Sequence, residues 1–271
     1  MLTLRSDLEI DRMRRAGLLV WHGLQIAGSM MRAGVKTIEV DSRVEQFFLD
    51  QKAIPLFKGY PGGRHPFPGT ICISVNEEVV HGIPGGRVLQ DGDIVSVDTG
   101  AKIDGWCGDS ALTFPVGEID AESKRLLDVT RRMLEIAIES LPSCSYWSEV
   151  ARKMESHAKE AGYSVIETLV GHGIGREMHE DPQVPNYVCS EILRAGDFRV
   201  QPGLVIAIEP MVNAGKKTVK TLSDHWTIVT IDKKRSAHFE HTVAVTRGGV
   251  RVLTGPPQNE SEKIDISAYC D

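Results

Sequence analysis

Apolar residues recur every three or four positions in two segments near the N-terminus, which is the spacing of one face of a helix. Ser6 or Asp7 can cap the first helix, which the pattern ends near Gly34, and Thr37 can cap the second. A stretch rich in Gly and Pro follows at 55–69. After it come short runs typical of β-strands, at 71–75, 93–98 and 110–114. The first half therefore predicts two helices followed by strands.

The second half of the chain repeats this order. Apolar positions form a helical stripe from Leu126 to Leu141, where Pro142 stops it, and a second stripe runs from Trp147 to Gly162. Strand-like runs follow at 164–170, 204–209, 226–231 and 242–246. The order helix, helix, strands thus occurs twice, as expected for two similar halves.

Polar residues fall at corresponding places in the two halves. Each half carries a His-Gly-Ile motif, then an acid that ends an apolar strand, then an acid that opens the next strand. The residues are His81, Asp98 and Asp109 in the first half, and His172, Glu209 and Glu240 in the second. Acids at equivalent strand positions would meet about a pseudo-twofold axis, so we predict one catalytic domain over 1–271, with duplicated halves at about 5–116 and 120–254. Chance recurrence of short motifs is the alternative, and the shared order of elements argues against it.

Composition narrows the class of protein. The 271 residues carry a formal net charge of −6, with 41% hydrophobic and 25% charged residues, which excludes a disordered chain. The mild acidity argues against tight binding to a nucleic-acid backbone, which needs a concentrated basic surface, although it leaves room for a local basic patch. No apolar run approaches the ~20 residues of a membrane span. Charged residues near the N-terminus do not fit a signal peptide. Five scattered cysteines without a CxxC pair indicate reduced thiols, so we expect a cytoplasmic protein with no membrane contact.

Taken singly, each acid or histidine has an ordinary explanation, as a solvated turn residue, a helix cap or a structural histidine. Asp98 and Glu209, however, directly follow apolar strands, and burying a carboxylate without a partner is costly. Metal cations are the partners that suit a cluster of acids with few bases nearby. Four negative charges and one imidazole would come from Asp98, Asp109, His172, Glu209 and Glu240.

Two divalent ions about 3.5–4 Å apart would match the charge of this cluster, and carboxylates can bridge such a pair. Oxygen donors with one nitrogen suit Mn, Fe(II), Co or Zn, whereas a structural zinc site would use thiolates. The expected cofactor is therefore two divalent metal ions per chain.

Eight longer motifs occur in order along the chain: FKGY (57–60), ICISVNEEVVHGIP (71–84), VDTG (97–100), GDSA (108–111), GHGIG (171–175), MHEDP (178–182), IEPM (208–211) and FEHTV (239–243). Because of these motifs, the chain resembles the type I methionine aminopeptidases of the creatinase/aminopeptidase group, from about Ile10 to Thr254. The resemblance implies an α+β pita-bread fold, in which two pseudo-twofold-related halves of antiparallel sheet have helices packed outside. It also implies removal of the initiator methionine from nascent proteins and peptides, with a small second residue preferred.

The same resemblance assigns roles to individual residues. It implies that Asp109 and Glu240 bridge the two metals. Asp98 would hold one ion, and His172 with Glu209 would hold the other. Among the residues expected to act on the substrate, Glu209 would relay a proton from the nucleophile to the leaving amine. His179 would bond the developing oxyanion, and His81 would contact the backbone beside the scissile bond.

A methionine side chain needs a narrow apolar pocket, and the expected walls are Tyr60, Cys72, Met178 and Trp226. Plain core packing is the alternative, and it is strongest for Met178. The segment between Tyr60 and Cys72 is about four residues longer than the family pattern, with residues 64–68 as the extra material. We expect this insert to rim the pocket. The polar tail at 255–271 is expected to be loosely held.

Other functions fit the sequence less well. The VDTG motif at 97–100 also occurs in aspartic proteases, but no second copy is present and His172, Glu209 and Glu240 would stay unexplained. Residues 171–175 lack the spacing of a phosphate-binding loop. A catalytically inactive relative would have lost metal ligands, whereas all five positions carry ligating side chains. Aminopeptidase P and prolidase normally carry an extra N-terminal domain, for which this length leaves no room.

The expected partner is the N-terminal methionine of nascent polypeptides, met near the ribosome. We expect a monomer, with no specific nucleic acid and no membrane among its partners.

Overall fold

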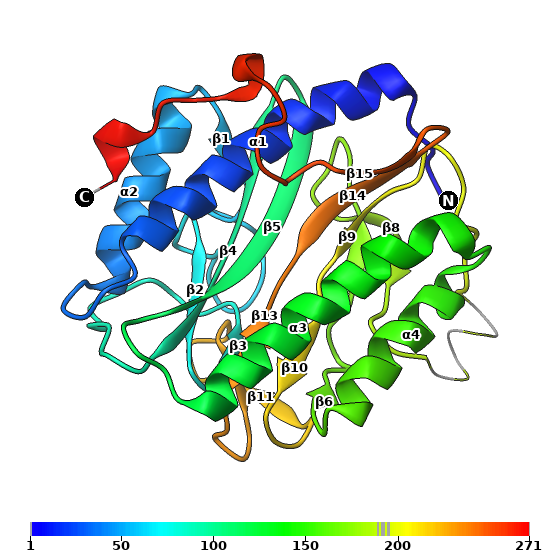
Figure 1. Ribbon diagram of the computed structural model, residues 1–271. Coiled ribbons are helices and arrows are strands. Elements are labelled where there is room, and N and C mark those ends of the chain that lie inside the picture. Colours follow the sequence, from blue (N-terminus) through cyan, green and yellow to red (C-terminus); the bar gives the residue numbers. More distant parts are fainter. Residues whose placement is uncertain (1, 189, 191–192, 194–195, 271) are drawn as a thin grey trace.

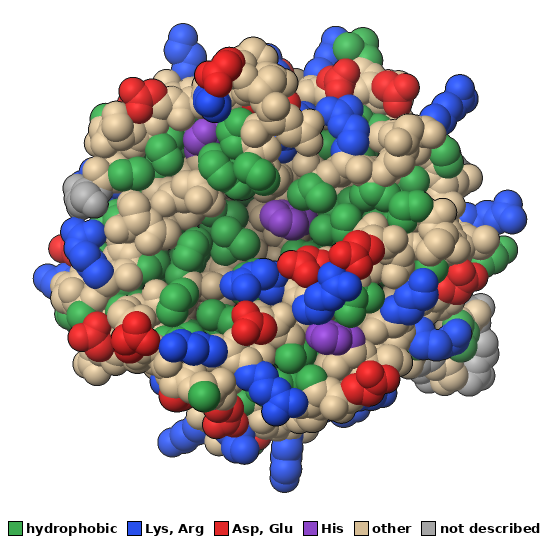
Figure 2. Space-filling view, viewed as in Figure 1, with side chains coloured by type: hydrophobic (Ala, Val, Ile, Leu, Met, Phe, Trp, Pro, Cys, Tyr) green, Lys and Arg blue, Asp and Glu red, His purple; other side chains and the backbone are tan. Residues whose placement is uncertain are grey.

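The computed structural model describes residues 2–188, 190, 193 and 196–270. Four long helices form two pairs, α1 (Asp7–Ser29) with α2 (Thr37–Asp50), and α3 (Ala121–Ser140) with α4 (Trp147–Glu160). Figure 1 shows α1 and α3 crossing in front of the strands. Figure 2 shows side chains of both charges interspersed over this helix-covered face. None of the helices in the described residues is both long and apolar enough to cross a membrane.

Antiparallel sheets carry the rest of each half. In the first half, β4 (Ile94–Ile103) lies between β1 (Ile54–Pro55) and β2 (Cys72–Val75), and it also pairs with β5 (Trp106–Pro115). The five-stranded sheet of the second half has the order β15 (Gly249–Val252), β14 (His241–Thr246), β9 (Val205–Ile208), β7 (Gly171–Gly173) and β8 (Glu180–Val184). The expected α+β class with antiparallel sheets and outer helices is confirmed.

Two small sheets complete the described fold. One has the order β13 (Ser236–His238), β10 (Met211–Asn213) and β6 (Ser164–Val165). The other has the order β11 (Val219–Thr221), β12 (Ile228–Thr230) and β3 (Glu78–Val80). The second sheet therefore joins a strand of the first half to a hairpin of the second.

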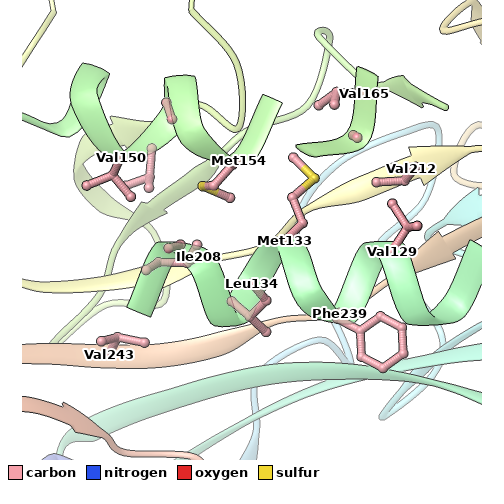
Figure 3. Close-up of a cluster of buried hydrophobic side chains, with 14 of the residues drawn as sticks. Val129, Met133, Leu134, Val150, Met154, Val165, Ile208, Val212, Phe239 and Val243 are labelled. Atoms are coloured by element: carbon pink, nitrogen blue, oxygen red, sulfur yellow. The ribbon is translucent and has the colours of Figure 1, made fainter. Parts of the chain in front are cut away.

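Each helix pair buries its apolar stripe against the sheets of its own half. In the second half, Met133 and Leu134 of α3 and Met154 of α4 meet Ile208 and Val243 of the five-stranded sheet (Figure 3). A corresponding cluster packs α1 and α2 against β2 and β4. The two cores hold the sheets in place from outside and leave the opposite faces of the strands free for polar side chains.

The start of α1 agrees with the cap expected from the sequence, whereas the expected cap of α2 was wrong, because Lys36 is its N-cap and Thr37 is already the first helical residue. Ser6 caps α1, with Glu9 donating its N–H to the Ser6 hydroxyl and accepting from the Ser6 N–H. The end of α1 was predicted too late, near Gly34. The helix ends at Ser29 because the backbone of Gly34 and Val35 pairs with Leu89 instead.

The predicted strand ends near the acids were wrong in the first half. Asp98 was expected to end a strand and Asp109 to open one, but both lie inside the ten-residue strands β4 and β5. The strands continue because all ten positions of β4 pair with β5, and the two-residue turn at Asp104 and Gly105 has positive φ at both positions. The predicted strand at 164–170 is likewise only Ser164–Val165, and His172, expected in a turn, lies in β7.

The C-terminal tail differs from the loosely held segment that we expected. Ile264, Ile266 and Tyr269 pack against the core of the first half, and the Tyr269 hydroxyl donates to Asp50 at 2.7 Å. Apolar residues spaced between polar ones in the tail explain this docking. The free thiols in the described residues are Cys72, Cys107, Cys144 and Cys270, and Cys189 lies outside them.

Candidate metal site and substrate pocket

The five residues expected to bind metal come from different strands and line one pocket. Ligand atoms of Asp109, His172 and Glu240 lie within 4.8 Å of one another. The carboxylates of Asp98 and Asp109 are neighbours that influence each other's pKa. The Oε1 atom of Glu209 lies 3.8 Å from Nε2 of His172. The structure therefore brings together all five side chains, although they span 142 positions of sequence.

Register in the β4–β5 hairpin places the first two acids. Asp98 pairs with Ala111 and Asp109 pairs with Gly100, so the two carboxylates are diagonal neighbours on one face. A Cβ atom at Gly100 would lie 3.3 Å from Oδ1 of Asp109. Glycine at that position therefore leaves room for the carboxylate.

The junction of the two halves places the other residues. The N–H of Glu240, just before β14, donates to the carbonyl of Ala111 in β5 at 2.8 Å. Next to β14 in the same sheet, Glu209 follows β9, and His172 in β7 pairs with Ala207. The acids of both halves thus meet where β5 joins β14, as the recurrence in the sequence predicted.

The acid cluster is buried and short of positive charge. Burial, with repulsion between the carboxylates, raises the pKa of Asp98, Glu209 and Glu240 well above the usual range. One carboxylate oxygen each of Asp98, Asp109 and Glu240 is buried and has no hydrogen-bond partner among the described residues. No Lys or Arg of the described residues lines the pocket. This donor set, of unpartnered oxygens beside an imidazole, fits divalent cations.

His172 presents the right atom to such a cation. Its Nδ1 lies 2.9 Å from the carbonyl of Gly173, which can only accept, so Nδ1 carries the proton. The lone pair of Nε2 then faces Asp109 and Glu209. Burial lowers the pKa of His172 to about 4, so the ring is neutral near pH 7.

An apolar cavity adjoins the acid cluster. The four expected wall residues all line it, namely Tyr60, Cys72, Met178 and Trp226. Met178 also packs in a small apolar cluster with Phe57, Phe67 and Cys72, so it is both a wall and a packing residue. His81 and His179 line the same cavity.

The insert at 64–68 forms part of the cavity wall. Phe67 is only 2% exposed, and its ring packs edge-on against Trp226 at 5.3 Å. The indole Nε1 donates to the carbonyl of His65 at 2.9 Å. Backbone hydrogen bonds join Phe67 to Gly59 and Tyr60. The insert is therefore folded onto the pocket, beside the residues expected to contact a substrate.

His179 lies between the acid cluster and the cavity. Its ring centre is 4.3 Å from that of His172, and its Nδ1 is 2.8 Å from the Tyr60 hydroxyl. Burial lowers the pKa of His179 and lowers that of His81 to about 4. His81 lines the same cavity and lies edge-on to Trp226.

Several residues that line the cavity were not predicted from the sequence: Phe57, Val80, Leu169, Val170, Met211 and His238. His238, in β13, is 1% exposed, and its Nε2 lies 3.9 Å from Oε2 of Glu209. A usable signal was its position two residues before Glu240, because alternate residues of an extended chain share a face.

Comparison with known proteins gives consistent matches over nearly the whole chain. Residues 11–247 match metallopeptidase family M24. Methionine aminopeptidase 1 of Bacillus subtilis is 46% identical over 254 residues, which are 94% of this chain and 99% of that protein. The methionine aminopeptidase of Clostridium acetobutylicum is 43% identical, over 94% of this chain and 99% of that protein. The crystal structure of methionine aminopeptidase from Thermotoga maritima matches with a TM-score of 0.87 at 39% identity, covering 94% of this chain and all of that one.

Proposed function

The chain belongs to metallopeptidase family M24 and has the pita-bread fold, and from this premise we propose that it removes the initiator methionine from nascent proteins and peptides. It is a metal-dependent aminopeptidase. The observation that carries the proposal is the cluster of buried, unpartnered carboxylates beside an apolar cavity. We propose that residues 1–271 act as one catalytic domain, with halves at about 5–116 and 120–254.

Two divalent ions, of Mn, Fe(II), Co or Zn, are the proposed cofactors. Asp109 and Glu240 would bridge them, with Asp98 on one ion and with His172 and Glu209 on the other. The four carboxylates balance the charge of two such ions, and the free Nε2 of His172 supplies a nitrogen donor. When bound, the ions lower the pKa of a water molecule towards about 7, so that hydroxide is available at neutral pH.

The apolar cavity is the proposed site for the methionine side chain. Tyr60, Cys72, Met178 and Trp226 form its walls together with Phe67 of the insert. An unbranched thioether suits such a pocket, since sulfur makes favourable contacts with aromatic rings. The preference for a small second residue in the substrate is part of the proposal.

Three residues of the chain act on the substrate in this proposal. With the Tyr60 hydroxyl donating to Nδ1 of His179, Nε2 of His179 carries the proton and can donate to a developing oxyanion. Glu209 accepts a proton from the nucleophile and passes it to the leaving amine. His81, which also lines the cavity, contacts the substrate backbone beside the scissile bond.

We propose that the enzyme acts as a cytoplasmic monomer on nascent chains near the ribosome. The segment 214–235 supports this setting, because it carries six Lys and Arg residues against two Asp. Such a basic surface is attracted to RNA phosphates without reading sequence.

The proposal is tested by stripping the protein of metal and assaying it on Met-Ala-Ser and Leu-Ala-Ser, with Mn(II), Fe(II), Co(II) or Zn(II) restored in turn. We expect release of methionine only after a metal is restored, and little or no release of leucine. Equal cleavage of both peptides would contradict the methionine pocket. Full activity of the stripped protein would contradict the metal site.

A further inference from the structure

His238 is a buried histidine at the pocket to which the catalytic proposal gives no role. It is 1% exposed, and within the part of the chain that the structure describes neither ring nitrogen has a hydrogen-bond partner. Buried polar groups in folded proteins are nearly always paired, so an unpaired imidazole calls for an explanation. Its position offers one, because His238 lines the same cavity as Glu209 and His81.

The backbone of His238 is held firmly. Its N–H donates to Oγ1 of Thr113 at 2.9 Å, and the same hydroxyl donates to the His238 carbonyl at 2.7 Å. Its Cα pairs with Met211 in the small sheet of β13 and β10. The imidazole therefore reaches the pocket from a fixed main chain, as precise placement of a side chain requires.

Glu209 lies between two imidazoles. Its Oε1 is 3.8 Å from Nε2 of His172, and its Oε2 is 3.9 Å from Nε2 of His238. The main chain of Glu209 is also fixed, since its carbonyl accepts from Nδ2 of Asn186 at 3.0 Å. The side chain of Glu209 keeps its own rotations, and Nε2 of His238 faces the carboxylate oxygen that His172 does not face.

We propose that His238 is a positioning residue for Glu209, whose Nε2–H bonds Oε2 and so keeps Oε1 directed towards His172 and the metal site. The proposal rests on the proposed function for its effect on catalysis. The separation of 3.9 Å is longer than a hydrogen bond. Hydrogen bonds of catalytic groups are often long without substrate and shorten in the reacting complex.

Three substitutions at His238 test whether the site needs an N–H donor within reach of Glu209 or only a polar side chain at this position. His238→Gln keeps an N–H donor near the position of Nε2, whereas His238→Leu removes the donor at similar volume. His238→Asn keeps a polar group but is too short to reach Glu209. We expect the His238→Leu and His238→Asn variants to lower kcat on Met-Ala-Ser by about 10–100-fold, which is the usual effect of losing a partner that orients a metal ligand. KM and the amount of bound metal should change little. His238→Gln should stay within a few-fold of the wild type.

A second readout does not depend on the substrate. With Co(II) bound, the visible absorption spectrum reports on the ligands, so the Leu and Asn variants should show shifted bands at unchanged Co(II) content, and Gln the wild-type spectrum. His157→Leu is the matched control, because Nε2 of His157 is also buried and unpaired but lies on α4 outside the pocket. It should change neither kcat nor the spectrum.

The outcomes distinguish the two proposals. Wild-type kcat and spectrum in His238→Leu would overturn the role of His238, and so would equal losses in the Gln and Leu variants. Loss of bound Co(II) in both Leu and Asn variants would also overturn it, because His238 would then be a ligand. A wild-type protein that binds Co(II) but releases no methionine would contradict the proposed function, while the spectra would still decide the role of His238.

Discussion

Asp109 and Thr242 form two hydrogen bonds across the junction of the two halves. The N–H of Asp109 donates to Oγ1 of Thr242 at 3.1 Å, and the same hydroxyl donates to the Asp109 carbonyl at 2.8 Å. One hydroxyl of the second half thus fixes the backbone that carries an acid of the first. The candidate metal site depends on this contact for its geometry.

Replacing Thr242 by Val should therefore affect both stability and the site. The substitution keeps the shape and leaves two buried backbone groups of Asp109 without this partner, which should cost about 1–3 kcal/mol of unfolding free energy. Denaturant unfolding measures the loss, and metal titration should show weaker binding. Thr242→Ser, which keeps the hydroxyl, is the control. Equal losses in both variants would contradict a role for these hydrogen bonds.

Removing the metals should lower the melting temperature. Four carboxylates would then face one another in a buried site, and a ligand that binds only the folded state stabilises it by mass action. Thermal unfolding of the stripped protein should shift to higher Tm as Mn(II) or Co(II) is added. A Tm that no divalent ion changes would be incompatible with the two-ion proposal.

The insert should affect substrate binding rather than metal binding. Phe67→Ala, or removal of residues 64–68, takes away a wall of the cavity and the partner of Trp226, so KM for Met-Ala-Ser should change several-fold at constant metal content. Arg64→Ala, on the exposed part of the insert, is the control. Unaltered KM for Phe67→Ala and for the shortened chain would show that the insert is a passive surface loop.

The docked tail should loosen in acid. Arg14 lies 2.7 Å from Glu262 and holds the pKa of that carboxylate below its usual 4.5. A lowered pKa in the folded state means that the pair stabilises the fold above about pH 4.5 and stops doing so as pH falls through the lowered value. The protection of the tail against hydrogen exchange, taken relative to the intrinsic rate at each pH, should therefore fall below pH 4.5. Glu262→Gln should show the faster exchange already at pH 7, and identical exchange in both proteins would contradict this contact.

Local signals explain which parts of the fold could be predicted. The start of α1 is set by Ser6 and Glu9, which are three residues apart, so the sequence shows the cap directly. The length of β4 depends instead on pairing with β5. Its last residues, Thr99–Ile103, include Gly100, Ala101 and Lys102, which do not favour strands. They form a strand because they pair with β5.

The candidate site likewise has residues that the sequence could predict and residues that it could not. The acids could be predicted to meet because they recur beside apolar runs in both halves, although Asp98 and Asp109 lie inside their strands rather than at the ends. His238 ends the short buried strand β13, and its one local signal is its position two residues before Glu240. Its relation to Glu209 arises from the neighbouring strands β10 and β13, whose pairing joins positions far apart in sequence.

The central claim is that five residues hold metal while the neighbouring histidines act on the substrate. Bound metal and kcat, measured together for His172→Ala, His179→Ala and His81→Ala, test it most directly. We expect His172→Ala to lose one metal and its activity. His179→Ala should keep both metals and lose roughly 10²–10³ in kcat, as for removal of one oxyanion donor, and His81→Ala should keep both metals with a similar or smaller loss. Loss of metal in His179→Ala but not in His172→Ala would contradict the account.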